Sequence, residues 1–185
     1  MVDEAPPNSR NDGHWLPPGQ YPQPKPVKAH PLRISVFALI STWGKSKLHN
    51  YTKKMNGAFF TTVLKRALKE ITEVPNDHRD FVLVMDSATI HTCRHTVAWL
   101  QAHNVKFIPK SEWPASSPDF NPIENLWSTL KAQVHRRSPR TRSGLKRVAT
   151  KVWNAIPQDS VVKYVHALHK RYAHAIQLKG AQTAN

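Results

Sequence analysis

Cysteine, acidic residues and long apolar runs are all scarce in this sequence. Its one cysteine, Cys93, excludes a framework of disulfides within the chain and is typical of a protein from a reducing compartment. No run approaches the roughly 18 consecutive apolar residues that a membrane-spanning helix needs. At 185 residues the chain has the length of one ordinary domain. We therefore expect a soluble, intracellular protein with no membrane partner.

The 12 Asp and Glu are outnumbered by 27 Lys and Arg, which gives the chain a formal net charge of +15. A balance this basic predicts a polyanionic partner, most simply nucleic acid, although ribosomal proteins share it and charge alone selects no function. The excess is concentrated from Lys131 to the C-terminus, where 12 Lys and Arg accompany one acid, Asp159. We expect these C-terminal segments to contact DNA, with a merely solvated surface as the alternative.

Hydrophobic patterning predicts an α/β fold. Two β-rich stretches, 33–41 and 47–51, flank a Gly44-Lys45 turn and predict a hairpin. The apolar run 80–86 predicts a parallel strand buried on both faces, and 105–109 predicts another. Helical periodicity recurs in the segments 57–71, 92–103, 122–136, 145–156 and 161–176. The strand–helix–strand order from 80 to 109 predicts a right-handed βαβ unit.

The first 31 residues hold eight of the 15 prolines, so no helix can persist there. One interpretation is a disordered, proline-rich arm. The other is a long loop that joins the stub of a first strand, 1–4, to the strand at 33–41.

The most informative stretch is 113–127. Pro114 and Pro118 exclude a helix before residue 120, and Asn121 and Pro122 then suit the cap and the first helical position. Glu124 falls at the third helical position. It is either a capping-box acid or a catalytic carboxylate held by a stiff loop, and its local sequence leaves both open.

Asp86 offers a possible partner for Glu124. It ends the apolar run at 80–86, at the carboxyl end of a predicted strand, where open α/β sheets place their sites. Two converging carboxylates repel each other, so they are stable mainly when Mg²⁺ or Mn²⁺ binds them. A pair of such ions can stabilise both the attacking and the leaving oxygens of a phosphoryl transfer.

Three motifs resemble those of Tc/mariner-type DDE transposases. The signature around that family's last catalytic acid is similar to Trp113-Pro114-x-x-Ser117-Pro118-Asp119-x-Asn121-Pro122-Ile123-Glu124-Asn125-Leu126-Trp127. The second signature is similar to Val84-Met85-Asp86-Ser87-Ala88-x-x-His91, with Ser87 where the family usually has Asn. The segment after the first catalytic Asp is similar to Val2-Asp3-Glu4-x-x-x-Asn8. The resemblance covers nearly the whole chain.

This resemblance implies a ribonuclease-H-like fold, a five-stranded mixed β-sheet flanked by helices, with the first strand truncated here. It implies that Asp3, Asp86 and Glu124 form a triad that binds two Mg²⁺ or Mn²⁺ ions. The activity implied is metal-dependent DNA nicking followed by strand transfer, with transposon ends and target DNA as partners and a homodimer as a possible assembly. It also implies a nuclear location in a eukaryote and a cytoplasmic one otherwise.

Two departures from the family pattern leave an alternative function open. The chain begins two residues before Asp3, and nothing in it resembles the family's N-terminal helix-turn-helix modules, so we expect a catalytic-domain fragment. We expect a catalytic core at 1–138, with basic helices at 139–185 packed on the same domain. The alternative function is an inactive, truncated or domesticated remnant that only binds DNA. His91 is either a hydrogen-bond partner near the metal ions or a structural histidine.

Overall fold

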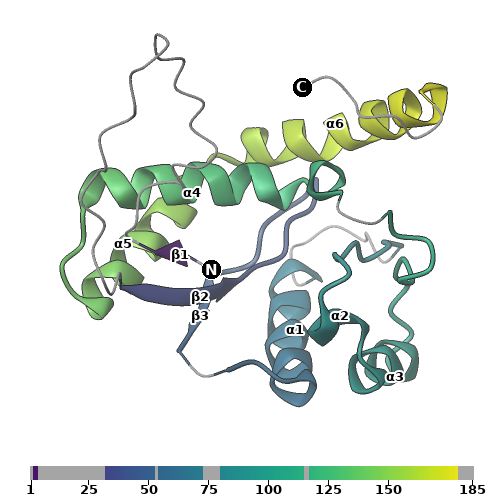
Figure 1. Cartoon of the computed structure of the whole chain (residues 1–185), viewed down its shortest axis with the longest axis horizontal. Helices are drawn as coiled ribbons and strands as arrows, with labels where there is room; N and C mark the ends of the chain where they lie inside the picture. Colours follow the sequence, from purple (N-terminus) through teal and green to yellow (C-terminus); the bar gives the residue numbers. More distant parts are fainter. Residues whose placement is uncertain (1, 4–31, 53, 73–79, 115–116, 179–185) are drawn as a thin grey trace, which may run out of the picture.

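The computed structural model describes residues 2–3, 32–52, 54–72, 80–114 and 117–178 (Figure 1). Helices make up most of this part of the chain. The elements in order are β1 (Val2–Asp3), β2 (Arg33–Phe37), β3 (His49–Tyr51), α1 (Gly57–Thr72), α2 (Thr89–Thr92), α3 (Arg94–Ala102), the 3-10 turn η1 (Pro118–Phe120), α4 (Ile123–Arg137), α5 (Arg142–Ala155) and α6 (Gln158–Gln177). Apart from β1, the stretch 1–31 lies outside the described residues.

The helices follow the predicted periodicity closely, with one exception. The segment predicted as a single helix at 92–103 is divided at Cys93, whose backbone is extended (φ −66°, ψ 152°). The Thr96 hydroxyl donates to the carbonyl oxygen of Ile90 at 2.7 Å, across this break. Cys93, a free cysteine, is only half-buried there. None of the helices within the described ranges is long and apolar enough to cross a membrane.

The predicted hairpin is confirmed. β2 pairs antiparallel with β3 in the register Ser35↔Tyr51 and Phe37↔His49. The connection closes where the Ser41 amide donates to the carbonyl oxygen of Gly44 at 2.8 Å. On its other edge β2 pairs antiparallel with β1, so the described strands form a small sheet in the order β1–β2–β3.

The prediction of parallel strands at 80–86 and 105–109 is wrong about their length. They meet in one parallel bridge, Leu83↔Phe107, so only their direction is as predicted. Val82 is 55% exposed, so the run is not buried on both faces. Because its side chains reach solvent and only one of its residues is paired, this segment gains too little stabilisation from burial to form a longer parallel β-ladder. The five-stranded mixed sheet is therefore not reproduced in the described residues.

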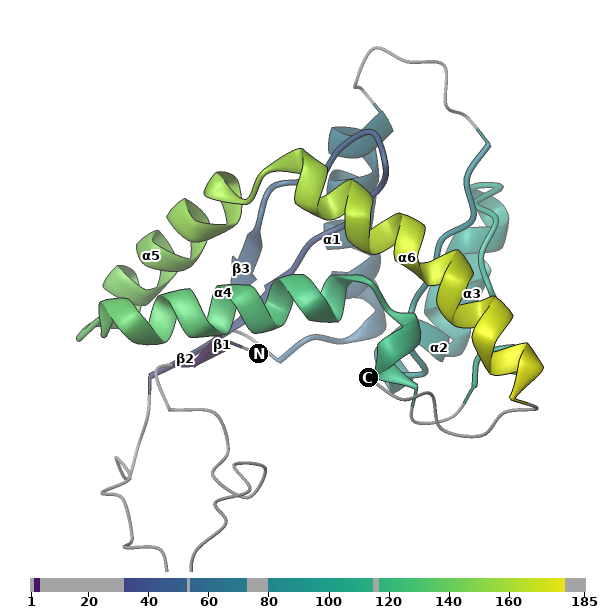
Figure 2. The ribbon, with the colours of Figure 1, turned by 90° about the horizontal axis from the view of Figure 1, so that it is seen from above.

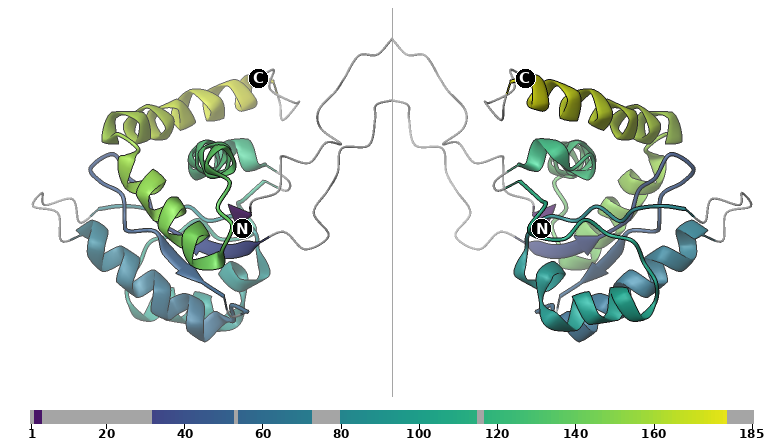
Figure 3. Two further views of the ribbon diagram at one scale, coloured as in Figure 1. Left: turned by 90° about the vertical axis from the view of Figure 1, so that its left-hand side faces the viewer. Right: turned by 90° about the vertical axis from the view of Figure 1, so that its right-hand side faces the viewer.

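Two apolar clusters form the core. The larger one joins β2 to α4, α5 and α6 through side chains such as Ile34, Leu130 and Trp153. The smaller one joins α1 and α3 to the Leu83 segment around Phe60. Figures 1 and 3 show α4 and α5 on one side of β2 and β3, with α1 on the other. The start of α4 and the Leu83 segment line the same pocket.

Candidate active site

Asp86 stands between an extended segment and the start of a helix. Leu83 fixes the segment, because its amide donates to Lys106 O at 2.8 Å and its carbonyl accepts from the Ile108 amide at 3.2 Å. Three residues later, Oδ1 of Asp86 accepts from the Ala88 amide at 3.1 Å, a local turn that leads into α2. The aspartate thus ends the segment as the sequence predicted, although the strand itself is short.

His91 holds the Asp86 carboxylate from the next helical turn. Its Nδ1 lies 2.6 Å from Oδ1 of Asp86, and its ring packs against that of Phe60 at a centroid distance of 4.7 Å. The hydrogen bond from His91 lowers the pKa of Asp86; partial burial opposes this, while the Ala88 amide and the charge of His91 add to it. Asp86 is therefore an ionised carboxylate at neutral pH, with Oδ2 unbonded within the described residues.

Glu124 lies in the first turn of α4 and is exposed. The capping-box interpretation is wrong, because within the described chain the Glu124 carboxylate makes no hydrogen bond or ion pair. Asn121 is extended and its carbonyl accepts from the Glu124 amide at 3.0 Å, but its side chain makes no capping bond either. The helix start is instead set by backbone conformation, since Pro122 already has helical dihedrals (φ −61°, ψ −22°).

Helix α6 braces the loop that leads to Glu124. Phe120 of η1 is buried and stacks on Tyr172 at a centroid distance of 4.9 Å. Beside it, Arg171 donates from Nη1 to the carbonyl oxygen of Asp119 at 2.6 Å. Burial in this contact raises the pKa of Tyr172. The C-terminal half of α6 therefore helps to fix where α4 begins.

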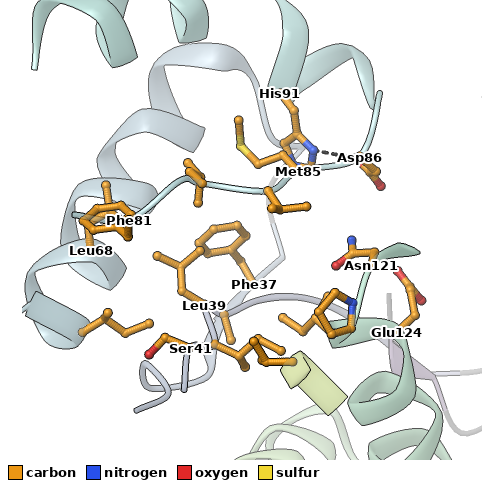
Figure 4. Close-up of a pocket in the computed structure, with 18 of the residues that line it drawn as sticks. Phe37, Leu39, Ser41, Leu68, Phe81, Met85, Asp86, His91, Asn121 and Glu124 are labelled. Atoms are coloured by element: carbon orange, nitrogen blue, oxygen red, sulfur yellow. Dashed lines mark hydrogen bonds and ion pairs between the residues drawn. The ribbon is translucent and has the colours of Figure 1, made fainter. Parts of the chain in front are cut away.

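Asp86 and Glu124 line one pocket of about 790 Å³. Figure 4 shows Asp86, Asn121 and Glu124 along one side of it, with the apolar side chains of Phe81 and Leu68 on the opposite side. The structure thus brings together two of the three predicted acids, which are separated by 37 residues in sequence.

Asp3 is placed through its backbone alone. It pairs with Arg33 in the β1–β2 ladder, and β1 lies against α4, the helix that carries Glu124. The position of its carboxylate lies outside what the structure describes. Among the side chains that are described, no cluster of three or more His, Cys, Asp or Glu could hold a metal ion.

The donors at this pocket nevertheless suit a hard divalent cation. Glu124 has a carboxylate with no partner in the described part of the molecule, and Asp86 has one free oxygen. Carboxylate oxygens are the ligands that Mg²⁺ and Mn²⁺ prefer, and neighbouring acids repel each other without a cation. Asp86 and Glu124 therefore each offer this pocket an oxygen donor of the kind that such a cation takes.

A family model described as "DDE superfamily endonuclease" matches residues 2–146, or 145 of the 185 residues. The chain belongs to this family. Two nematode relatives are a Tc3 transposase from Caenorhabditis elegans, 28% identical over 149 residues (80% of this chain, 44% of the relative), and a Tcb2 transposase from Caenorhabditis briggsae, 31% identical over 107 residues (57% and 37%). This DDE-family chain therefore spans less than half the length of these two relatives.

Solved structures show the same fold. The Mos1 mariner paired end complex with Mn aligns with a TM-score of 0.70 at 19% identity, covering 92% of this chain and 51% of that one. The catalytic domain of Mos1 transposase aligns with a TM-score of 0.65 at 16% identity, covering 80% and 76%. The Mos1 catalytic domain has also been solved with Mg and with Mn. The ribonuclease-H-like fold class predicted for this DDE-family chain is thus supported, although its predicted strand count is not.

Sequence reasoning left one feature of the site open and missed another. The Asp86–His91 contact was left as one of two interpretations, although a turn followed by one helical turn brings a residue five positions later back to the aspartate. The stacking of Phe120 on Tyr172 had no sequence signal, because the two residues are far apart in sequence and the pairing depends on how α6 crosses η1.

Proposed function

We propose that this chain is the catalytic domain of a Tc/mariner-type DNA transposase, which cleaves DNA strands and transfers them with the help of divalent metal ions. The observation that carries the proposal is the presence of Asp86 and Glu124 on one side of a single pocket. Family membership supports it, since the two acids lie in the motifs that resemble the family's signatures.

Each acid has a distinct setting in this proposal. Asp86 is held ionised and oriented by His91, so that its second oxygen can bind a metal ion. Glu124 is held by the start of α4, and Asp3 completes the triad from β1. When bound, one or two Mg²⁺ or Mn²⁺ ions would supply an activated oxygen nucleophile and neutralise charge on the phosphodiester.

The partners and location in this proposal follow from the resemblance to Tc/mariner-type transposases. Transposon ends and target DNA are the substrates, a homodimer is the assembly, and in a eukaryote the protein acts in the nucleus. The Mos1 structures describe a paired end complex and a strand transfer complex of that protein, which supports DNA as the partner here. The proposed division into a core at 1–138 and basic helices at 139–185 is part of the same hypothesis.

The direct test is metal-dependent nicking of supercoiled plasmid DNA by the purified 185-residue chain. We expect relaxed plasmid with Mn²⁺, none with excess EDTA, and recovery when Mn²⁺ exceeds the chelator, because the carboxylates need a cation to act on a phosphodiester. Gel electrophoresis measures the relaxed fraction. DNA binding without nicking at any Mn²⁺ concentration would instead support the alternative, a remnant that only binds DNA.

His91→Ala is expected to reduce Mn²⁺-dependent nicking about 10- to 100-fold, because Asp86 loses the group that orients it. The concentration of Mn²⁺ needed for half-maximal rate should rise, which a purely structural role would not produce. His91→Asn places a donor near the position of Nδ1 and should recover part of the affinity for Mn²⁺. A normal Mn²⁺ requirement in His91→Ala would show that His91 does not position Asp86.

A further inference from the structure

Helix α5 has two opposite faces. Its apolar face carries Leu145, Ala149 and Trp153, all fully buried in the larger core cluster. Helical spacing places a polar set on the opposite side, where it lines a shallow surface depression. The set consists of Ser143, Lys146, Arg147, Thr150, Lys151 and Asn154. Cations thus alternate with hydroxyl and amide groups along the exposed side of one helix.

The positive charge around this face is not balanced locally. The stretch 136–151 holds seven Lys and Arg and no Asp or Glu. None of the seven forms an ion pair in the described structure; Arg137 donates instead to Gln133. Like charges at this density repel one another, and a polyanion laid along them would relieve the repulsion. Hydroxyl and amide donors beside cations are also the groups that bind phosphate oxygens.

The basic stretch that leads to this surface begins at the end of α4 opposite to Glu124. Glu124 is in the first turn of α4 and Arg136 in its last, and twelve residues at 1.5 Å each separate them by about 18 Å. Figures 1 and 2 both show α5 at the opposite end of the molecule from α2, which directly follows Asp86.

We propose that the exposed face of α5, with Lys146, Arg147 and Lys151 at its centre, binds the phosphate backbone of duplex DNA at a distance from the bond that is cut. The distance to the cut rests on the proposed function, whereas the binding does not. Duplex DNA is favoured over an acidic protein because the surface pairs its cations with phosphate-binding donors and the chain belongs to a DNA endonuclease family.

The first test measures affinity for a 30-base-pair duplex by fluorescence anisotropy at several salt concentrations. The variant Lys146→Gln/Arg147→Gln/Lys151→Gln should bind about tenfold more weakly or worse, and its slope of log affinity against log salt should be shallower by about 2 to 3. The matched control Lys54→Gln/Lys65→Gln/Arg66→Gln removes the same number of exposed Lys and Arg outside this surface. Equal losses in the two variants would overturn the proposal.

The second test maps nicks on an end-labelled 40-base-pair duplex with Mn²⁺. The wild-type chain should nick less close to an end, where DNA cannot reach α5, and the α5 variant should lose this depletion. A depletion that persists in the α5 variant would overturn the proposed distance. Absence of nicking in every protein would contradict the proposed function, while the affinity comparison would still decide whether α5 binds DNA.

Discussion

Asp86→Asn and Glu124→Gln are each expected to reduce Mn²⁺-dependent nicking by about 1,000-fold or more, because each removes a negative charge that a metal ion requires. Both substitutions nearly conserve side-chain shape. An asparagine oxygen at position 86 can still accept from the Ala88 amide. Glu124 has no partner in the described structure, so its replacement should leave the free energy of unfolding unchanged within about 0.5 kcal/mol.

The comparison needs an acid that does not line the pocket. Glu112 is exposed and lies outside the pocket, so Glu112→Gln is expected to nick plasmid at the wild-type rate. The relaxed fraction of supercoiled plasmid is measured over time at one Mn²⁺ concentration, with circular dichroism to verify folding. Nicking by a folded Glu124→Gln variant at the rate of Glu112→Gln would exclude Glu124 from the chemistry.

The sequence predicted the site best where short-range chemistry decides it. Proline fixes its own φ and restricts the residue before it, so the start of α4 near Pro122 followed from a few neighbouring residues. Asp86 could be placed at the end of its segment for a similar reason, since the apolar run stops there. The pairing of Asp86 with Glu124 was only a possibility from the residues themselves and became specific through the resemblance, because no local rule joins residues on different elements.

The sequence failed where tertiary context decides. An apolar run such as 80–86 predicts burial on both faces, but whether neighbouring segments cover Val82 depends on the whole fold. The capping-box interpretation of Glu124 failed because residue types permit that bond without requiring it, and its carboxylate remains exposed. The brace from Tyr172 to Phe120 depends on the path of α6, which periodicity alone does not give.

Helix α4 connects the two regions that we propose to contact DNA, the candidate active site and the basic surface of α5. Its first turn holds Glu124, its last turn leads to the basic surface, and its buried side chains Leu126, Leu130 and Val134 fix it to the larger core cluster. Anything that loosens this cluster should therefore disturb both ends of the helix. Trp153 of α5 is the largest fully buried side chain in the cluster.

Trp153→Ala is expected to lower the free energy of unfolding by about 4 kcal/mol. The ring is fully buried and stacks on Trp127 at a centroid distance of 5.2 Å, so its removal leaves a cavity beside α4. Its Nε1 also donates to the carbonyl oxygen of Ser46 at 2.8 Å, and that buried acceptor would lose its partner. Since domains of this size are stable by about 5–15 kcal/mol, the variant would be close to unfolding.

Urea denaturation followed by far-ultraviolet circular dichroism measures this loss without relying on tryptophan fluorescence. Trp99→Ala is the matched control, because Trp99 is only partly buried, stacks on His103 at 4.1 Å and lies in the smaller cluster. We expect it to cost less than half as much. Trp153→Phe keeps an aromatic ring but loses the bond to Ser46, so it should fall between the wild type and Trp153→Ala. Equal losses in Trp99→Ala and Trp153→Ala would show that α5 does not anchor the larger cluster through Trp153.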